Sequence, residues 1–182
     1  MSHPRSHRAS GFTLIEAALT TVIVGTGILA MVAAQQAFHK KNDWAQRTGT
    51  AMLLANELRE LTLVMPSHDP FTATTVVGPE LDEVSVNDFD DVDDFAGPTV
   101  AGVGQGTDFD PPINALRQPI ANMNGWSQHI EVINVFPDNI ASDFAQPLGS
   151  TDLMRVTVTV NYQPPNAAES SAVTRLAWIV AR

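Results

Sequence analysis

The stretch FTLIEAALTTVIVGTGILAMVAA, residues 12–34, decides the fold of this chain. It carries one charged side chain, Glu16, and a helix rising about 1.5 Å per residue over this length can cross the hydrocarbon core of a bilayer. A cleaved secretory signal has an apolar region of only about 7–15 residues, with its small-residue cleavage site after that region. Here Ser10 and Gly11 precede the apolar run. The pattern therefore predicts a membrane-spanning helix that remains in the protein.

The charges that flank the span say little about its orientation. Arg5 and Arg8 precede it and favour a cytoplasmic N-terminus, whereas Lys40 and Lys41 follow it closely and nearly balance them. Charge alone therefore does not fix which side of the membrane carries the rest of the chain.

The hexapeptide GFTLIE at residues 11–16, preceded by a short basic leader, resembles the precursors of type IV pilins and type II secretion pseudopilins. The resemblance implies that a prepilin peptidase cuts between Gly11 and Phe12, removes residues 1–11 as a leader and methylates the new amino group of Phe12. It also implies a single-pass protein of the inner (cytoplasmic) membrane with a cytoplasmic N-terminus and a periplasmic or otherwise extracytoplasmic head. Its partners would be the peptidase, membrane lipid and other pilins or pseudopilins.

Glu16 needs an explanation of its own, because a carboxylate inside hydrocarbon costs roughly 2.5 kcal/mol or more. The resemblance implies that Glu16 pairs with the ammonium group of Phe12 on a neighbouring subunit and so sets the register of assembly. In the alternative, Glu16 lies at the membrane interface without a fixed partner.

A helical period continues beyond the span, so we expect one helix from Phe12 to Met65 with a membrane half (12–38) and an amphipathic half (39–65). Pro66 should end it. The stretch AMLLANELREL at 51–61 resembles I-type minor pseudopilins and type IV pilus modification proteins. Gly25 and Gly27 mark either a weak point or a site of close helix packing. The predicted apolar stripe comprises Phe38, Ala45, Thr48, Met52, Ala55, Leu58 and Thr62, widened by Leu54 and Leu61.

Residues 66–125 are rich in proline, glycine and acid, and we expect irregular loops with short strands. Carboxylate oxygens are the ligands that Ca²⁺ prefers, although the spacing is not that of an EF-hand. A calcium-stabilised loop resembles what major pseudopilins use, and an ordinary solvated acidic loop is the alternative. The glycines of G-x-G-x-G at 102–106 indicate a flexible loop, and the histidines at 39, 68 and 129 have no ligand spacing. The candidate calcium ligands are Asp88, Asp90, Asp91, Asp93 and Asp94.

From Trp126 the apolar period changes to two, which predicts strands at 129–136, 153–162 and 172–181 within an antiparallel sheet spanning 126–182. Val156, Val158 and Val160 should face a covered side, with Arg155 and the alternating threonines on a wet side. The amphipathic helix is the natural cover. The expected class is therefore α+β, a long N-terminal helix with a membrane-embedded first half packed on a C-terminal antiparallel sheet, as in pilins.

The composition of the chain argues against several classes of function. The net charge is −10, and every charged residue between 80 and 110 is acidic, so nucleic acid is not an expected partner. The chain has no cysteine and hence no disulfide or thiolate metal site. Neither a catalytic constellation nor a site for a small-molecule substrate is recognisable. We expect a structural minor pseudopilin or pilin rather than an enzyme; the alternative is a membrane-anchored binding module whose acidic loops contact cargo, a surface or calcium.

Overall fold

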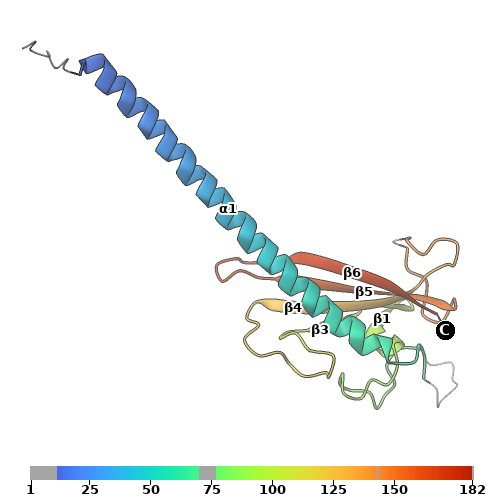
Figure 1. Ribbon diagram of the computed structural model, residues 1–182. Coiled ribbons are helices and arrows are strands. Elements are labelled where there is room, and N and C mark those ends of the chain that lie inside the picture. The colour runs from blue at the N-terminus through green and yellow to red at the C-terminus, as the bar shows by residue number, and fades with distance from the viewer. Residues whose placement is uncertain (1–11, 70–76, 143, 182) are drawn as a thin grey trace, which may run out of the picture. The chain divides into compact units, whose positions relative to one another are not determined.

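A computed structural model describes residues 12–69, 77–142 and 144–181 (Figure 1). The chain forms two compact units, Met1–Ala45 and Gln46–Arg182. Helix α1 (Leu14–Leu63) contributes residues to both, and the second unit, here called the head, contains the strands. A long N-terminal helix with a C-terminal antiparallel sheet confirms the predicted α+β class.

In the first unit α1 is exposed along its whole length, and from residue 17 to residue 34 it is free of charged side chains. Within the described residues it is the one helix long and apolar enough to cross a membrane. Its threonine hydroxyls are satisfied inside the helix: Thr21 donates to the carbonyl of Ala17 at 2.9 Å and Thr26 to that of Val22 at 3.0 Å. Such bonds leave no hydroxyl that would have to find a partner in lipid. The helix is continuous through Gly25 and Gly27.

The part of α1 that belongs to the head buries one face, formed by Ala51, Leu54, Ala55, Leu58, Leu61 and Thr62. The C-terminal part of the predicted stripe, Leu54 to Thr62, is therefore confirmed. Thr48 is only half-buried, Ala45 is exposed, and Met52 and Phe38 are 41% and 70% exposed. In a helix of 3.6 residues per turn, residues seven apart are rotated by about 20° relative to each other. A stripe built from residues seven apart therefore moves gradually off the buried face. The helix ends at Leu63, two residues before the predicted limit, because Met65 precedes a proline.

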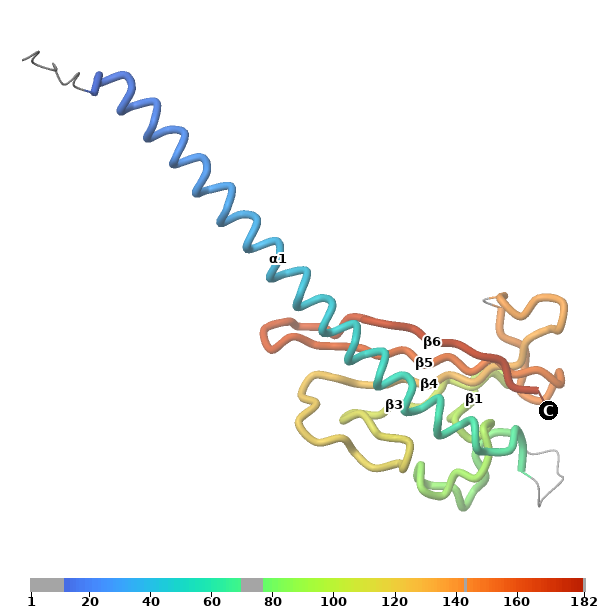
Figure 2. The backbone as a smooth tube through the Cα atoms, in the orientation of Figure 1, coloured from blue at the N-terminus to red at the C-terminus, as the bar shows by residue number. Residues whose placement is uncertain are grey.

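The head contains a four-stranded antiparallel sheet in the order β3-β4-β5-β6, formed by Thr107–Phe109, Trp126–Asn134, Leu153–Tyr162 and Ser171–Ala181. The last two long strands lie within one residue of their predicted bounds, whereas β4 begins three residues before the predicted 129 and ends two residues before the predicted 136. Strand β3 adds an edge strand from the segment expected to be irregular. In Figure 2 the chain from 77 to 125 winds beside β3 and the end of α1.

One face of the sheet packs on α1, as the alternation predicts. Val156, Val158 and Val160 are fully buried, and Val158 lies opposite Ile130 on β4 and Leu176 on β6. The other face is not wholly wet, contrary to expectation. Ile133 and Thr157 are nearly fully buried there, because Arg155 donates to the carbonyls of Ile140 and Ser142 and holds that loop over the sheet.

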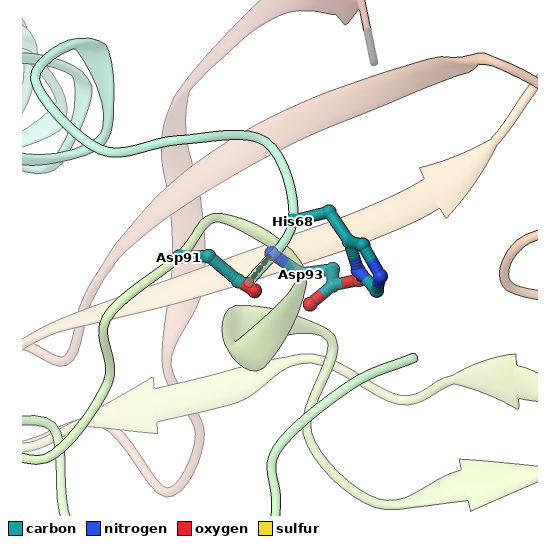
Figure 3. Close-up of side chains that lie close together, drawn as sticks. All are labelled: His68, Asp91 and Asp93. Atoms are coloured by element: carbon teal, nitrogen blue, oxygen red, sulfur yellow. Dashed lines mark hydrogen bonds and ion pairs between the residues drawn. The ribbon is translucent and has the colours of Figure 1, made fainter. Parts of the chain in front are cut away.

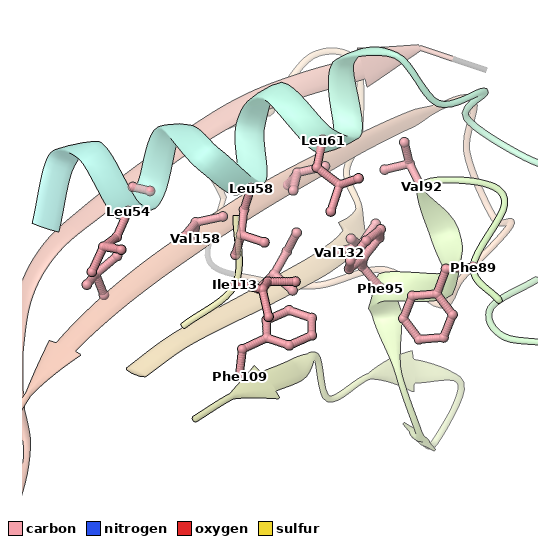
Figure 4. Packing of buried hydrophobic residues seen from close by; sticks show 14 of the residues in the cluster. Leu54, Leu58, Leu61, Phe89, Val92, Phe95, Phe109, Ile113, Val132 and Val158 are labelled. Carbon is pink, nitrogen blue, oxygen red and sulfur yellow. The ribbon is translucent and has the colours of Figure 1, made fainter. Parts of the chain in front are cut away.

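The core joins α1, the sheet and the acidic segment (Figure 4). Leu54, Leu58 and Leu61 point from the helix towards the sheet, and Phe95 packs edge-on between Phe89 and Phe109, with ring centroids 5.1 and 6.5 Å away. The acidic segment between α1 and the sheet therefore supplies aromatic side chains to the core and is not a loose loop.

The segment 77–125 also holds the short strands that the sequence predicts only in general terms. Strands β1 (Thr99–Val100) and β2 (Val103–Gly104) form a hairpin whose turn residues, Ala101 and Gly102, both have positive φ. A 3-10 helix, η1 (Asp93–Ala96), precedes them. The G-x-G-x-G glycines thus belong to an ordered hairpin and its connection to β3, with Gly102 in the turn and Gly104 in β2, rather than to a flexible loop.

Candidate functional site

The N-terminal motif lies at the start of α1. Gly11 is outside the described residues, so the predicted cut between Gly11 and Phe12 stays a prediction. Thr13 precedes the first helical residue and accepts a hydrogen bond from the backbone N–H of Glu16 on its hydroxyl oxygen at 3.3 Å. That is the N-cap half of a capping box, in which Ser or Thr stands three residues before Glu or Gln.

Glu16 is exposed in the first turn of α1. A carboxylate there is stabilised by the positive end of the helix dipole. Glu16 therefore has a local role in starting the helix, beside the intersubunit role that the resemblance implies.

The five aspartates proposed as calcium ligands do not form one set. Asp88 accepts from the backbone N–H and the hydroxyl of Ser85 at 2.9 and 2.8 Å, which closes a local turn. Asp93 lies 2.9 Å from Nδ1 of His68 (Figure 3). Only Asp90, Asp91 and Asp94 come together as a group, because the tight turn before η1 sends neighbouring side chains in different directions.

Asp91 and Asp94 hold this turn by binding each other's backbone. Oδ1 of Asp91 accepts from the N–H groups of Asp93 and Asp94 at 2.8 and 3.2 Å. Oδ2 of Asp94 accepts from those of Asp90 and Asp91 at 2.9 and 3.1 Å. The second oxygen of each, Oδ2 of Asp91 and Oδ1 of Asp94, is buried without a hydrogen-bond partner, although the two residues are only 1% and 0% exposed.

Two glutamates complete the cluster and were missed from the sequence. Ligand oxygens of Glu80, Glu83 and Asp94 lie within 4.8 Å of one another, as do those of Asp90, Asp91 and Asp94, so Asp94 belongs to both groups. Glu80 and Glu83 are brought close by a turn in which the N–H of Glu80 donates to Oε2 of Glu83 at 2.8 Å. Their spacing of three in an acidic segment was the available signal. We call Glu80, Glu83, Asp90, Asp91 and Asp94 the carboxylate cluster.

A third group links the cluster to the segment that follows α1. His68, Asp91 and Asp93 offer ligand atoms within 4.8 Å of one another, and Figure 3 shows the imidazole of His68 against Asp93. The N–H of Val92 also donates to the carbonyl of Pro66 at 3.0 Å. His68 shows no ligand spacing in the sequence, since its partners Asp91 and Asp93 are more than twenty residues away in the chain.

The carboxylates of the cluster repel one another and are poorly solvated. Burial, then the carboxyl of Asp93, raises the pKa of Asp91 to about 8. Burial, reinforced by the charge of Asp91, raises the pKa of Asp94 to about 8. A hydrogen bond shared with Glu83, followed by burial, raises the pKa of Glu80 to about 7. Near neutral pH the site thus has a strong demand for positive charge, in the form of protons or of a cation.

Basic side chains of the described part of the chain meet little of that demand: the charge of Arg117 only partly offsets the raised pKa of Asp90. The nearby Arg117 directs its guanidinium to the carbonyls of Val86 and Asn87, both at 2.9 Å, and no lysine or arginine of the described residues pairs with a carboxylate of the cluster. The cluster opens on a cavity of about 330 Å³ whose lining is wholly acidic: Asp69, Glu80, Asp82, Glu83, Asp88 and Asp90.

Comparison with family models, with curated proteins and with solved structures finds no match for this chain. The assignment of function therefore rests on the residues themselves.

Proposed function

We propose that this chain is a minor subunit of a type II secretion or type IV pilus-like filament, anchored in the inner membrane by the first half of α1. The precursor is cut between Gly11 and Phe12 by a prepilin peptidase. The head lies on the extracytoplasmic side, and the mature protein acts by assembling with other pilins or pseudopilins rather than by catalysis.

One observation carries the proposal: the GFTLIE motif stands directly before a single uninterrupted helix that is exposed and apolar in its first half and forms part of a folded core in its second. An exposed apolar helix of this length must be covered by lipid or by other subunits. In a filament subunit, lipid covers the apolar helix in the bilayer, and neighbouring subunits cover it in the assembled fibre.

Processing and assembly give the direct test. In membranes that contain a prepilin peptidase, mass spectrometry should find mature protein beginning at Phe12, and Gly11→Val should leave the full-length precursor. A mature N-terminus at any other residue contradicts the proposal.

Glu16→Ala should still be inserted and cut, but crosslinking between subunits through the span should be lost. Glu60→Ala, which removes an exposed carboxylate from the head half of α1, is the matched control and should assemble normally. Thr13→Ala removes the cap while keeping Glu16. If Thr13→Ala abolishes assembly as fully as Glu16→Ala, the motif acts by starting the helix and the intersubunit pairing of Glu16 is wrong.

The acid-lined cavity favours a second candidate, a membrane-anchored binding module. The two functions separate on Phe12 and Glu16, because a binding module with an intact head would keep its activity when these residues are changed.

A further inference from the structure

Strand β6 forms one edge of the sheet, and among the described residues it pairs only with β5 (Figure 1). The backbone groups on its outer side, from Ser171 to Ala181, make no hydrogen bond within the described part of the chain. Proteins usually protect such an edge with proline, lysine or a short strand, because free N–H and C=O groups can pair with another chain. β6 has no proline and no lysine, and Arg175 is its one charged residue. The edge is therefore open to an added strand.

A groove of about 360 Å³ lies beside this edge, on the sheet face that points away from α1. Its floor is at Ala177 of β6, whose small side chain lies opposite Thr157 of β5. Arg155 and Ile179, which lie opposite each other on the same two strands, flank the floor on one side, and Arg175 flanks it on the other. The remaining lining residues are Ile140, Ala141 and Trp178.

Two guanidinium groups make the groove positively charged in a chain whose net charge is −10. Arg155 uses its Nη1 for the loop carbonyls, whereas its Nε is buried without an acceptor among the described residues. The hydroxyl of Thr157 is buried without a partner as well. Arg175 is 59% exposed and lies 3.9 Å from Oε2 of Glu131, which is beyond hydrogen-bond distance. The groove thus has more donors than the described acceptors satisfy, and a carboxylate would complement it.

The groove is placed to receive a side chain from a strand added to β6. Such a strand would lie about 4.8 Å away, with every second side chain on the side of the groove. A side chain opposite Ala177 meets no bulk there, and it is a diagonal neighbour of Arg175, within reach of long side chains. Glutamate at that position brings its carboxylate to the guanidinium of Arg175. The apolar surface of Ile179, which is 39% exposed, packs against the same strand.

The charges argue against a second copy of this chain as the added strand. β6 contains no acidic residue, so two copies paired edge to edge would bring two Arg175 side chains to the grooves and no carboxylate. Like charges on adjacent strands are destabilising. The partner is therefore a different protein with an acidic residue in an extended segment.

We propose that the free edge of β6 and the groove over Ala177 form a strand-addition site for an extended segment of another protein, with a glutamate of that segment bound at Arg175. Main-chain hydrogen bonds supply the affinity of such a site, and the pocket for an alternate side chain supplies its specificity. The site goes beyond the proposed function, which assembles the subunit through α1 and needs no contact by β6.

The test uses the full-length mature protein in detergent micelles and a fluorescein-labelled synthetic peptide in which valine alternates with serine around a central glutamate. Fluorescence anisotropy measures binding, with empty micelles of the same detergent as the blank. The peptide should bind saturably at micromolar concentration. A peptide with lysine in place of the glutamate should bind about tenfold more weakly, because its charge is repelled by the groove.

Methylated peptides test whether the peptide is added as a strand. Successive N–H groups of a strand point to opposite edges, so only every second one can pair with β6. One peptide carries N-methyl groups on its valines, and the other carries them on its serines and glutamate. One of the two should lose binding, and the other should keep it.

Two variants of the protein locate the site. Arg175→Glu should weaken the glutamate peptide about tenfold and strengthen the lysine peptide by about as much, because the charge at the groove is reversed. Arg175 is largely exposed, so this variant should melt close to the wild type. Arg59→Glu is the matched control, because Arg59 is exposed on α1 and the net charge changes equally. It should leave both affinities unchanged.

Four results overturn the proposal. The first is no saturable binding of the glutamate peptide above the blank. The second is equal binding of the glutamate and lysine peptides, or an equal effect of Arg175→Glu and Arg59→Glu, which removes the groove from the site. The third is an equal effect of the two methylations, which means that the peptide is not added as a strand. The fourth is a stable dimer in sedimentation that the peptide does not dissociate, which means that a second copy covers β6. All of these experiments use purified mature protein, so they are independent of processing and filament assembly.

Discussion

Gln128 shows what single residues contribute to the head. It lies on β4 with no exposed surface, and its Nε2 donates to the carbonyls of Leu54 on α1 and Ile113 at 2.8 and 3.2 Å, while its Oε1 accepts from the N–H of Ile113 at 2.8 Å. One amide thus connects the helix, the segment 77–125 and the sheet.

Replacing Gln128 by leucine should destabilise the head by about 2 kcal/mol or more, because the N–H of Ile113 is left buried without a partner. Chemical denaturation of the detergent-solubilised protein measures the loss. Gln105→Leu is the control, since Gln105 is exposed and its side chain donates to the carbonyl of Val103, two residues before it. Equal stabilities for the two variants would mean that the bonds of Gln128 are replaced by water.

For single residues, the sequence predicts that the candidate site is made of carboxylates, but it does not predict which residues form it. The acidic run 88–94 identifies carboxylates near the right place, but which of them converge depends on turns that composition does not encode. Glu80, Glu83 and His68 lie near these aspartates through contacts between residues distant in the chain. Asp88 lies outside the carboxylate cluster because its carboxylate accepts a hydrogen bond from Ser85. Whether a cation occupies the site stays a prediction.

Among the elements, α1 and the three long strands follow from the sequence because each repeats a pattern over many residues. The elements that escape precise prediction are short: β1, β2, β3 and η1 each have at most four residues, too few for any period. Their positions are set by packing on β4 and by turns with positive φ, such as that at Gly106.

The head half of α1 offers a matched pair of leucines for an element-scale test. Leu58 is fully buried against the sheet, whereas Leu53 on the same helix is 71% exposed. Leu58→Ala should lower the free energy of unfolding by about 3 kcal/mol, because it removes buried area and leaves a cavity.

Leu53→Ala changes helix propensity only slightly and should stay within about 0.5 kcal/mol of wild type. Urea titrations of both variants measure the difference. A loss in Leu53→Ala as large as that in Leu58→Ala would mean that the helix face assigned here to the core is wrong.

The whole molecule combines an exposed helical unit that has no core of its own with a head that encloses one. Residues 14–45 of α1 bury nothing within their own unit, whereas the head encloses a core made by Leu58 of the helix, by the sheet and by Phe95. Within the head, the guanidinium of Arg47 on α1 lies over the ring of Tyr162 on β5, 4.8 Å from the ring centroid. This cation–π contact holds the first turn of α1 that belongs to the head against the sheet.

A protein lacking residues 1–39 should therefore be soluble without detergent and unfold in one cooperative transition, because its core-forming residues all lie after position 50. Calorimetry and size-exclusion chromatography check this. The full-length protein without detergent is the control and should aggregate. A truncated protein with a broad, non-cooperative transition would mean that the core needs the first unit to fold.

Three acids of the carboxylate cluster change how the protein moves in an electric field. The formal charge of −10 and the isoelectric point of 4.7 both treat Glu80, Asp91 and Asp94 as ordinary carboxylic acids. In the native protein their raised pKa values keep them protonated at a pH where the unfolded chain has already ionised them. The folded, metal-free protein therefore carries less negative charge than its sequence states and focuses at a higher pH, and it takes up protons from the buffer each time it folds.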